Sequence, residues 1–310
     1  MQRASAVIIG IAVLVAIAIG AFLFFSSRND SPAASSPSPL PSIPEPDPSA
    51  TLADDLLDRR WTVLYVGTDL NDRREADGQG PNTDALMLVS LSADGSELTL
   101  VSLPRDTVDV PLADGSTYGN KINALYNERG IDALVGAMET LYGVPIDGHL
   151  VLDMDDFGAL VDAVGGLEVS PDAPLRDPIV DLDLQPGPQM LDAGGILGYV
   201  RTRVDQDYGR MGRQQEVIVA LVRELTDPAA EVDLVPLIEG LDSLETDLPL
   251  DELPTLLELA RRGASAEVEA VLIEPPLITF EGDRGDGRGY VLEPDVEAIR
   301  AEVQALIGDG

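Results

Sequence analysis

Apolar positions along the chain follow two spacings. Short apolar runs bounded by turn residues are typical of buried strands, whereas apolar residues three and four positions apart are typical of helices. The first spacing predicts strands at residues 61–66, 85–91, 98–103, 149–152, 167–169 and 268–273. The second predicts helices at residues 131–141, 154–164, 210–225, 251–262 and 294–307. Because strands and helices interleave, we expect a sheet covered by helices on both faces.

The amino-terminal part departs from this pattern. Residues 4–25 carry no charge, and about 22 helical residues would span ~33 Å, enough to cross a bilayer. Arg3 precedes this stretch, which favours an amino terminus in the cytoplasm. We therefore predict a single-pass membrane anchor within residues 1–28, with a cleaved signal peptide as the rival interpretation.

A Pro- and Ser-rich segment follows over residues 29–56, and its composition cannot build a core. We expect an extended linker there and one folded domain over residues 57–310. Export of everything beyond the apolar stretch would place this domain outside the cytoplasm, tethered to the cell membrane.

Acidic residues outnumber basic ones by 55 to 20, which gives a net charge of −35. Such a surface repels nucleic acid, so an anionic ligand has to be bound by a local group of cations. The chain has no Cys and a single His, which excludes disulfides, thiolate metal sites and multi-histidine zinc sites. We interpret His149 as a structural residue at a strand edge.

Three polar residues are predicted to meet at one edge of the sheet. Asp84 begins one strand of a predicted hairpin with an Asp94-Gly95 turn, and Arg105 follows the other strand. Asp69 follows the strand at residues 61–66 and would join them if that strand is a neighbour. Two carboxylates and an arginine could hold Mg²⁺ and a phosphate together. The alternative is that each acid is an ordinary solvated surface group.

A second group of cations lies between residues 199 and 215. Arg201 and Arg203 project on one side if that stretch is extended, and they diverge if it ends a helix. Arg210, Arg213 and Gln214 share one face of the helix that follows. Arginine offers planar, two-pronged donors suited to phosphate oxygens, although surface ion pairs would explain the same spacing.

In order along the chain, these segments resemble the LytR-CpsA-Psr family of bacterial cell-envelope proteins. The resemblance extends over about residues 58–307. The matching segments are LYVGTDL, NTDALMLVSL, SLPRD, KINALY, GVPIDGHLVLDMDDFGALVDAVGGLEV, YVRTR, DYGRMGRQQ and GYVLEPDVEAIRA.

The resemblance implies a three-layer α/β/α fold with a mixed central sheet, preceded by one transmembrane helix. It also implies an enzyme that transfers a glycopolymer from a polyprenyl-pyrophosphate carrier to peptidoglycan and forms a phosphodiester link. By this resemblance, Asp69 and Asp84 are ligands of Mg²⁺ (or Mn²⁺). The pyrophosphate clamp would consist of Arg105, Arg201, Arg203 and Arg210. Substrate-binding residues near it would be Lys121, which is the chain's only lysine, and Asp207, Arg213 and Gln214.

Two positions depart from the family pattern. Members often carry Arg two places before the second Asp, where this chain has Asn82, and Arg shortly after the first Asp, where it has Leu70 and Asn71. Arg73 or Arg74 could substitute. An apolar slot for the lipid is expected between the sheet and the helices at residues 131–141 and 154–164.

Alternative functions remain open at this point. A polyprenyl-pyrophosphate hydrolase would need the same residues, with water as acceptor. A non-catalytic module that binds polyprenyl phosphate or wall polymer would not need Asp69 and Asp84 as a pair. Direct DNA binding is disfavoured because the domain is acidic and has no basic recognition helix.

Overall fold

The computed structural model describes residues 57–69, 80–227, 230–241, 244–249 and 252–308. The predicted anchor at residues 4–25, the linker at residues 29–56, and Arg73 and Arg74 lie outside the described residues. Within the described ranges, no helix combines the length and apolar character needed to cross a bilayer.

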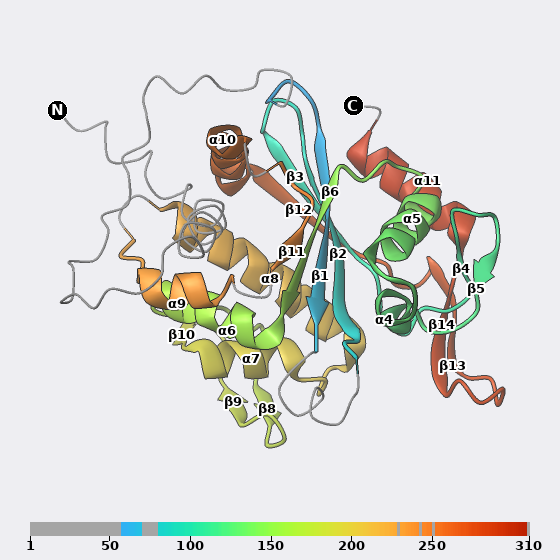
Figure 1. The fold of residues 1–310 in the computed structure, drawn as a ribbon. Helices are drawn as coiled ribbons and strands as arrows, with labels where there is room; N and C mark the ends of the chain where they lie inside the picture. Colours follow the sequence, from blue (N-terminus) through green and yellow to red (C-terminus); the bar gives the residue numbers. More distant parts are fainter. Residues whose placement is uncertain (1–56, 70–79, 228–229, 242–243, 250–251, 309–310) are drawn as a thin grey trace, which may run out of the picture.

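The centre of the molecule is a mixed six-stranded sheet with the strand order β11-β6-β1-β2-β3-β12 (Figure 1). Three neighbouring pairs are antiparallel (β1–β2, β2–β3 and β6–β11) and two are parallel (β1–β6 and β3–β12). The strands are β1 (Trp61–Thr68), β2 (Thr83–Leu91), β3 (Glu97–Ser102), β6 (Gly148–Asp153), β11 (Glu245–Thr246) and β12 (Glu267–Leu272).

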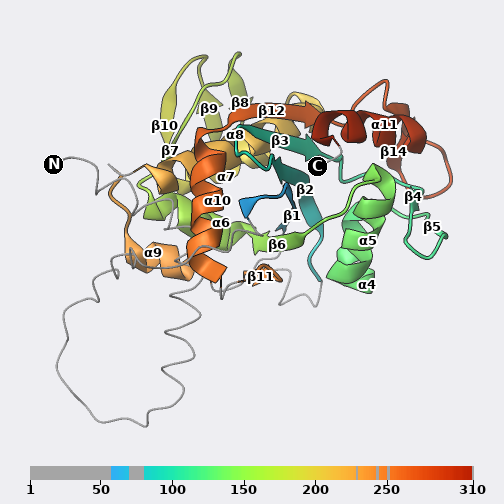
Figure 2. The ribbon, with the colours of Figure 1, turned by 90° about the horizontal axis from the view of Figure 1, so that it is seen from above.

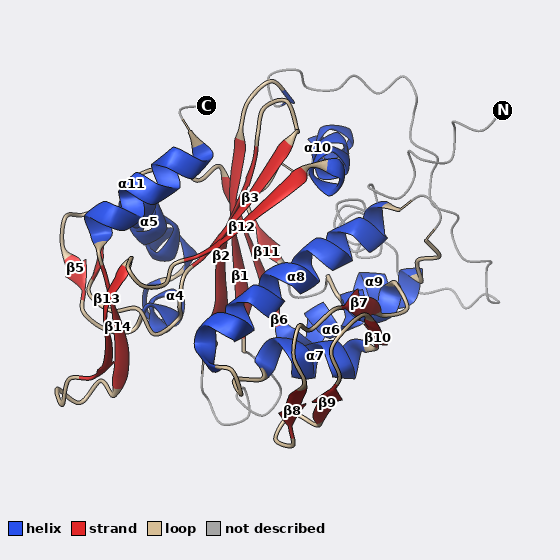
Figure 3. Ribbon diagram, turned by 180° about the vertical axis from the view of Figure 1, so that it is seen from behind, coloured by secondary structure: helices blue, strands red, loops and turns tan. Residues whose placement is uncertain are grey.

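Helices cover both faces of this sheet, as the views from above and behind show (Figures 2 and 3). One layer contains η1 (Ile122–Ala124), α4 (Leu125–Arg129), α5 (Ile131–Tyr142) and α11 (Val296–Ile307). The other contains α6 (Met154–Ala163), α7 (Ala193–Arg201), α8 (Gln206–Thr226), α9 (Leu234–Glu239) and α10 (Leu253–Ser265). The predicted α/β fold with a mixed central sheet is therefore confirmed.

Four two-stranded sheets lie outside the central one. They pair β4 (Val110–Pro111) with β5 (Thr117–Tyr118), β7 (Leu167–Val169) with β10 (Gln189–Leu191), β8 (Leu175–Asp177) with β9 (Leu182–Leu184), and β13 (Ile278–Asp283) with β14 (Tyr290–Pro294).

Each layer of helices buries its own apolar cluster against the sheet. On the first face, Leu134, Met138 and Leu141 of α5 are fully buried against strand residues such as Leu64 and Leu88. Their spacing of three and four residues is the helical pattern seen in the sequence. Burial of such side chains contributes about 1.5–3 kcal/mol each, which makes this packing the main support of the sheet.

The predicted hairpin between β2 and β3 is present. Gly95 adopts a φ of +71°, a conformation that side chains rarely tolerate, and its N–H donates to the Ser92 carbonyl at 2.9 Å. A Cβ at this position would also meet the Arg262 side chain at 2.7 Å. Glycine is therefore required here both by the turn and by the packing of α10.

The predicted starts of two helices were wrong. The helix expected at residues 210–225 begins at Gln206, and the one expected at Pro294 begins at Val296, because Pro294 still belongs to β14. His149 is a structural residue, as predicted: it is 7% exposed, and its Nδ1 lies 3.1 Å from Asp247 Oδ1.

Candidate active site

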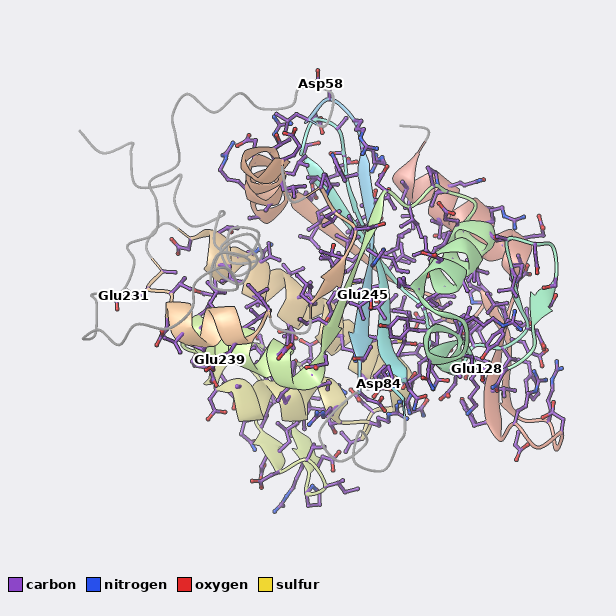
Figure 4. The ribbon with its side chains drawn as sticks, in the orientation of Figure 1. Asp58, Asp84, Glu128, Glu231, Glu239 and Glu245 are labelled. Atoms are coloured by element: carbon purple, nitrogen blue, oxygen red, sulfur yellow. The ribbon has the colours of Figure 1, made fainter. Side chains whose placement is uncertain are left out.

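A β-bulge places Asp84 at the edge of the sheet. The register of β1 and β2 pairs Gly67 with Ala85 and Thr68 with Thr83, so Asp84 is the extra residue between two paired positions. Gly67 allows the strands to approach closely here, since a Cβ would lie 3.0 Å from that of Ala85. A bulge redirects the side chain of its extra residue. Figure 4 shows Asp84 at the lower end of the sheet.

Asp69 lies at the same edge, as the hairpin argument predicted. Its N–H donates to the Asn82 carbonyl at 3.0 Å, and its Oδ1 accepts from the Asn82 N–H at 2.7 Å. Asn82, where the family resemblance led us to expect Arg, thus extends the pairing of β1 and β2 through its backbone. Asp69 is fixed one residue beyond Thr68, while Asp84 follows Thr83 on the paired strand.

Arg105 follows β3 and forms an ion pair with Asp84, in which Nη1 donates to Oδ1. Both side chains are about one-fifth exposed. Burial lowers the pKa of Arg105, but Asp84, Asp106 and Asp207 outweigh it, so the pKa is raised overall. The guanidinium therefore stays charged at the sheet edge.

Lys121 also lies near this edge. Its Nζ is 3.1 Å from Oδ1 of Asp106, the residue after Arg105. The backbone N–H of Asn123 donates to the Arg105 carbonyl at 3.2 Å, which brings the start of η1 against the Arg105 loop. The structure therefore places Lys121 beside the candidate site and in contact with Asp106.

Arg210 connects helix α8 to the bulge. Its side chain is 2% exposed, and its Nη1 donates to the Asp84 backbone carbonyl at 2.6 Å. Its Nε donates to Asp207 Oδ1 at 3.0 Å, and Nη2 lies 3.0 Å from the same oxygen. A buried guanidinium cannot lose its charge and needs such partners. The first turn of α8 is thereby held against β2.

Arg203 brings a third guanidinium to this place. It lies in the turn between α7 and α8, 3.8 Å from Asp207 through Nε, with a side chain that is 41% exposed. Its pKa is lowered, first by partial burial and then by the positive charges of Arg105 and Arg210. Three arginines therefore converge closely enough to repel one another, an arrangement that favours binding of an anion.

Several polar atoms at this convergence have unused hydrogen-bonding capacity. Within the described part of the chain, Arg105 Nε and Asp207 Oδ2 are buried without a hydrogen-bond partner, and Arg210 Nη2 has only its ion pair with Asp207 Oδ1 at 3.0 Å. An unmade hydrogen bond of a buried polar atom costs roughly 1–3 kcal/mol, more for charged groups. Two N–H donors on neighbouring cations are well suited to oxygens of a phosphate group.

The remaining predicted site residues support the turn between α7 and α8. Arg201 is exposed at the end of α7, and Arg203 lies beyond it, so the two side chains do not share one extended face. Arg213 donates to the carbonyls of Tyr199 (2.8 Å) and Thr202 (2.6 Å) and to Asp205 (2.5 Å). It therefore positions the backbone that carries Arg203.

Two buried residues lie within the matching segments YVRTR and DYGRMGRQQ but were not among the predicted site residues. Gln215 is buried, and its Nε2 donates to Ser102 Oγ at 3.0 Å and to the Val271 carbonyl at 2.9 Å, which ties α8 to β3 and β12. Thr202 is fully buried and donates to Asp177 Oδ2 at 2.7 Å. Both act on the backbone around the arginines, and neither belongs to a charge pattern that sequence analysis could detect.

An apolar groove begins beside the charged site. A small cleft lined by Asp84, Gln214 and Phe157 shares Tyr65 and Ile218 with a cavity of about 240 Å³. That cavity lies between the sheet and helices α8 and α10, and its lining continues to Trp61 and Leu91 at the other end of β1 and β2. The other residues that line it are Val63, Val89, Leu98, Leu100, Leu150, Val219, Val222, Arg223, Thr226, Leu248, Leu256, Leu259, Ala260, Gly263 and Ala264.

The apolar cavity lies only partly where the lipid slot was predicted. Helix α5 packs in the core on the opposite face of the sheet, where its side chains are fully buried. Helix α6 contributes Met154 and Phe157 to the cleft at the charged end, and the larger cavity belongs to α8 and α10. Hydrophobic spacing identifies the buried face of a helix but not the face of the sheet that receives it.

The carboxylates can be tested as ligands for a metal ion. In the part of the chain that the structure describes, no cluster of three or more acidic or histidine side chains could enclose a cation. Mg²⁺ is commonly bound by one or two carboxylates, with phosphate oxygens and waters completing its shell. The pair of Asp69 and Asp84, beside cations that suit a phosphate, fits this type of site.

The chain was compared with known proteins. A model of the LytR_cpsA_psr family matches residues 42–302. The probable cell wall biosynthesis protein LcpB of Corynebacterium glutamicum is 39% identical over 150 residues, covering 47% of this chain and 35% of LcpB. The polyisoprenyl-teichoic acid–peptidoglycan teichoic acid transferase TagV of Bacillus subtilis is 27% identical over 267 residues, covering 81% of this chain and 65% of TagV. The chain thus spans about one third of the length of LcpB and just under two thirds of the length of TagV.

Solved structures share the fold. The crystal structure of B. subtilis TagV gives a TM-score of 0.62 at 25% identity and covers 81% of this chain and 98% of that chain. The LytR-CPS2A-psr family protein YwtF (TagT), solved with bound octaprenyl pyrophosphate lipid, gives a TM-score of 0.60 at 21% identity, covering 82% and 93%. Because the identity to this second structure is only 21%, the likeness shows a shared fold and nothing more. With a family match that extends over most of its length, the chain belongs to the LytR_cpsA_psr family.

Proposed function

We propose that the chain is a Mg²⁺-dependent phosphotransferase that moves a glycopolymer from a polyprenyl-pyrophosphate carrier onto peptidoglycan. The observation that carries this proposal is the convergence of Arg105, Arg203 and Arg210 beside Asp84, where an apolar groove begins. A ligand with a diphosphate head and a long apolar tail matches both the cations and the groove.

The relatives support this choice of substrate. TagV is named a polyisoprenyl-teichoic acid–peptidoglycan teichoic acid transferase, and TagT was solved with octaprenyl pyrophosphate. A hydrolase or a simple binding module would have the same cations, but the family names favour transfer to peptidoglycan.

In the proposed reaction, a sugar hydroxyl of peptidoglycan attacks the phosphorus that carries the glycopolymer. A P–O bond to the sugar forms, the P–O bond to the bridging oxygen breaks, and polyprenyl phosphate leaves with that electron pair. The hydroxyl proton passes to a nearby carboxylate or to solvent. Guanidiniums already fixed around the diphosphate need no reorganisation as charge develops on the leaving group.

Each side chain has a distinct part in this scheme. Arg105 and Arg210 would bring two guanidinium charges beside the diphosphate, and Arg203 would add a more exposed one. Asp207 orients Arg203 and Arg210, since its Oδ1 lies within 3.8 Å and 3.0 Å of them. Asp69 and Asp84 would hold Mg²⁺, or Mn²⁺, which when bound would neutralise phosphate charge.

The cell membrane is the proposed location, with residues 4–25 as anchor and the folded domain outside the cytoplasm. The uncharged stretch over these residues supports this location. Leu57 packs in one apolar cluster with Trp61 and Leu91, at the end of the groove away from Asp84. Figure 4 shows the neighbouring Asp58 and Asp84 at opposite ends of the sheet. A chain anchored at residues 4–25 would therefore enter the folded domain at the groove end away from Asp84.

The first prediction concerns the arginines. Replacing Arg203 by Lys removes the planar donor, and we expect kcat/KM for glycopolymer transfer to fall by roughly 30- to 1000-fold, or about 2–4 kcal/mol. Arg261→Lys is the matched control, because Arg261 is exposed and pairs with Glu258. Equal activity of both variants would reduce Arg203 to a surface charge. Product analysis separates peptidoglycan-linked polymer from the soluble product of a hydrolase.

The second prediction concerns the metal. Asp69→Ala and Asp84→Ala should each abolish the turnover that depends on added Mg²⁺, because each replacement removes one of the two proposed protein ligands. Asp132→Ala, at an exposed position of α5, should behave as wild type. Thermal unfolding should show all three variants folded. A normal Mg²⁺ response in Asp84→Ala would rule out its role as a ligand.

The third prediction concerns the groove. Ala260→Trp should fill part of it and raise KM for a long-chain polyprenyl donor by ~15-fold, the effect of losing burial of about two methylene groups. A donor with a very short prenyl chain should be unaffected, as should Ala301→Trp on the exposed face of α11. Equal KM changes for long and short donors would contradict a lipid site in this groove.

The fourth prediction concerns location. A reporter fused after Asp54 should be active if it requires an extracytoplasmic environment and inactive if it requires the cytoplasm. This follows because residues 4–25 would export everything after them. Cytoplasmic activity would contradict both the anchor and access to peptidoglycan.

A further inference from the structure

The hairpin of β13 and β14 is joined to the candidate site by backbone contacts. Leu292 forms a parallel bridge with Thr107, and its N–H donates to the Asp106 carbonyl at 3.1 Å. Val108 in turn donates to the Leu292 carbonyl at 2.9 Å. Tyr290 lies two residues before Leu292 on the same strand, and Arg105 and Asp106 form the turn just before Thr107. The strand therefore carries Tyr290 to the edge of the arginine cluster.

Tyr290 is an exposed aromatic residue. Its side chain is 51% exposed, whereas Trp61, Tyr118, Tyr142 and Tyr199 are buried. Burial of part of the ring and the negative charges of Glu281, Asp207 and Asp106 raise its pKa. The phenol is therefore neutral and lies close to two acids that flank the clamp arginines. An accessible aromatic ring with a polar hydroxyl can contact a ligand through both its face and its edge.

Polar groups suited to hydroxyls surround this ring. The hydroxyl of Tyr208, in the first turn of α8, donates a hydrogen bond to the carboxylate of Glu281 in β13. This contact joins the hairpin to the helix that carries Arg210. Glu281 also interacts with the Tyr290 hydroxyl. The result is an aromatic face bordered by a carboxylate and a phenol, a combination that can stack on the C–H face of a sugar and bind its hydroxyls.

The loop at the end of the hairpin is fixed before any ligand binds. Arg288 Nη1 donates to the Gly119 carbonyl at 2.5 Å and lies 3.2 Å from Asp109 Oδ1. A held surface loses less entropy when a ligand binds. The figures place the hairpin on the α4 and α11 side of the sheet, whereas the apolar groove runs along α8 and α10 on the other side (Figures 1 and 3).

We propose that Tyr290, Tyr208 and Glu281 form the binding surface for the acceptor sugar, with a pyranose ring of the peptidoglycan glycan stacked on Tyr290. This inference rests on the proposed transferase function and names its acceptor side. It places the acceptor across the arginine cluster from the lipid tail, so that a sugar hydroxyl approaches the phosphorus from the side opposite the leaving polyprenyl phosphate. Such an approach is the in-line geometry of phosphoryl transfer.

The test compares Tyr290→Ala and Tyr290→Phe with Met190→Ala, which removes an exposed apolar side chain of β10. The acceptor is a series of soluble, uncross-linked glycan strands, and the donor is a polyprenyl-pyrophosphate-linked saccharide. Tyr290→Ala should raise KM for glycan strands by roughly tenfold, as expected for loss of an aromatic stacking contact. The KM for the donor should not change, and Tyr290→Phe and Met190→Ala should keep both wild-type values.

A second measurement separates this inference from the function on which it rests. Binding of the same proteins to glycan strands is measured directly, without a donor. Weaker binding of Tyr290→Ala supports the surface even if wild-type protein transfers nothing, a result that would refute the proposed function alone. Unchanged KM and unchanged binding in Tyr290→Ala overturn the surface while leaving the transferase intact. A raised KM for the donor in Tyr290→Ala would assign Tyr290 to binding of the donor glycan and would also overturn the proposed acceptor surface.

Discussion

Arg210 holds together the parts of the molecule on which the site depends. A guanidinium with 2% of its surface exposed keeps its charge, so folding must supply acceptors to replace the water it loses. Two of them are Asp207 on its own helix and the backbone carbonyl of Asp84 on the sheet. The second contact joins α8 to the bulged strand β2. Together with the contacts of Arg213 and Gln215, it holds the turn that carries Arg203 near the sheet.

Charge is distributed very unevenly in this protein. The net charge is −35, yet Arg105, Arg203 and Arg210 lie near enough to one another to lower the pKa of Arg203. Acidic neighbours make this possible, because Asp84 and Asp207 separate and orient the guanidiniums. The acidic surface elsewhere disfavours polyanions in general. Within the described residues, the proposed anion site therefore lies at one edge of one sheet.

The sequence allowed the sheet, most helices and the meeting of Asp69, Asp84 and Arg105 to be predicted. The strands are continuous apolar runs, and the geometry of a hairpin brings the start of β2 beside the end of β3. Helix α7 was not predicted, because its Gly194 and Gly195 lower the helical tendency of an already short segment. As a result, the sequence could not decide whether Arg201 and Arg203 project on one side of an extended stretch or diverge at the end of a helix.

Other features depend on contacts between distant segments. The bulge at Asp84 requires the close approach of Gly67 to Ala85, which no local pattern signals. The β13–β14 hairpin contains a glycine-rich turn and is held by Asp106 and Gly119, residues more than 150 positions away. The face of the sheet that holds the groove is decided by where α8 and α10 pack. Each of these features is set by tertiary contacts, which outweigh the local conformational preference of the sequence.

The groove runs along β1, and this gives the domain a fixed height. Six residues separate Gly67 at the charged end from Trp61 at the other, and a strand rises ~3.3 Å per residue, so the two ends are ~20 Å apart. A lipid tail lying in the groove would leave near Trp61 and keep its head group at that distance from the bilayer. In the proposed transferase, the length of one strand would then set the height above the bilayer at which the diphosphate is held.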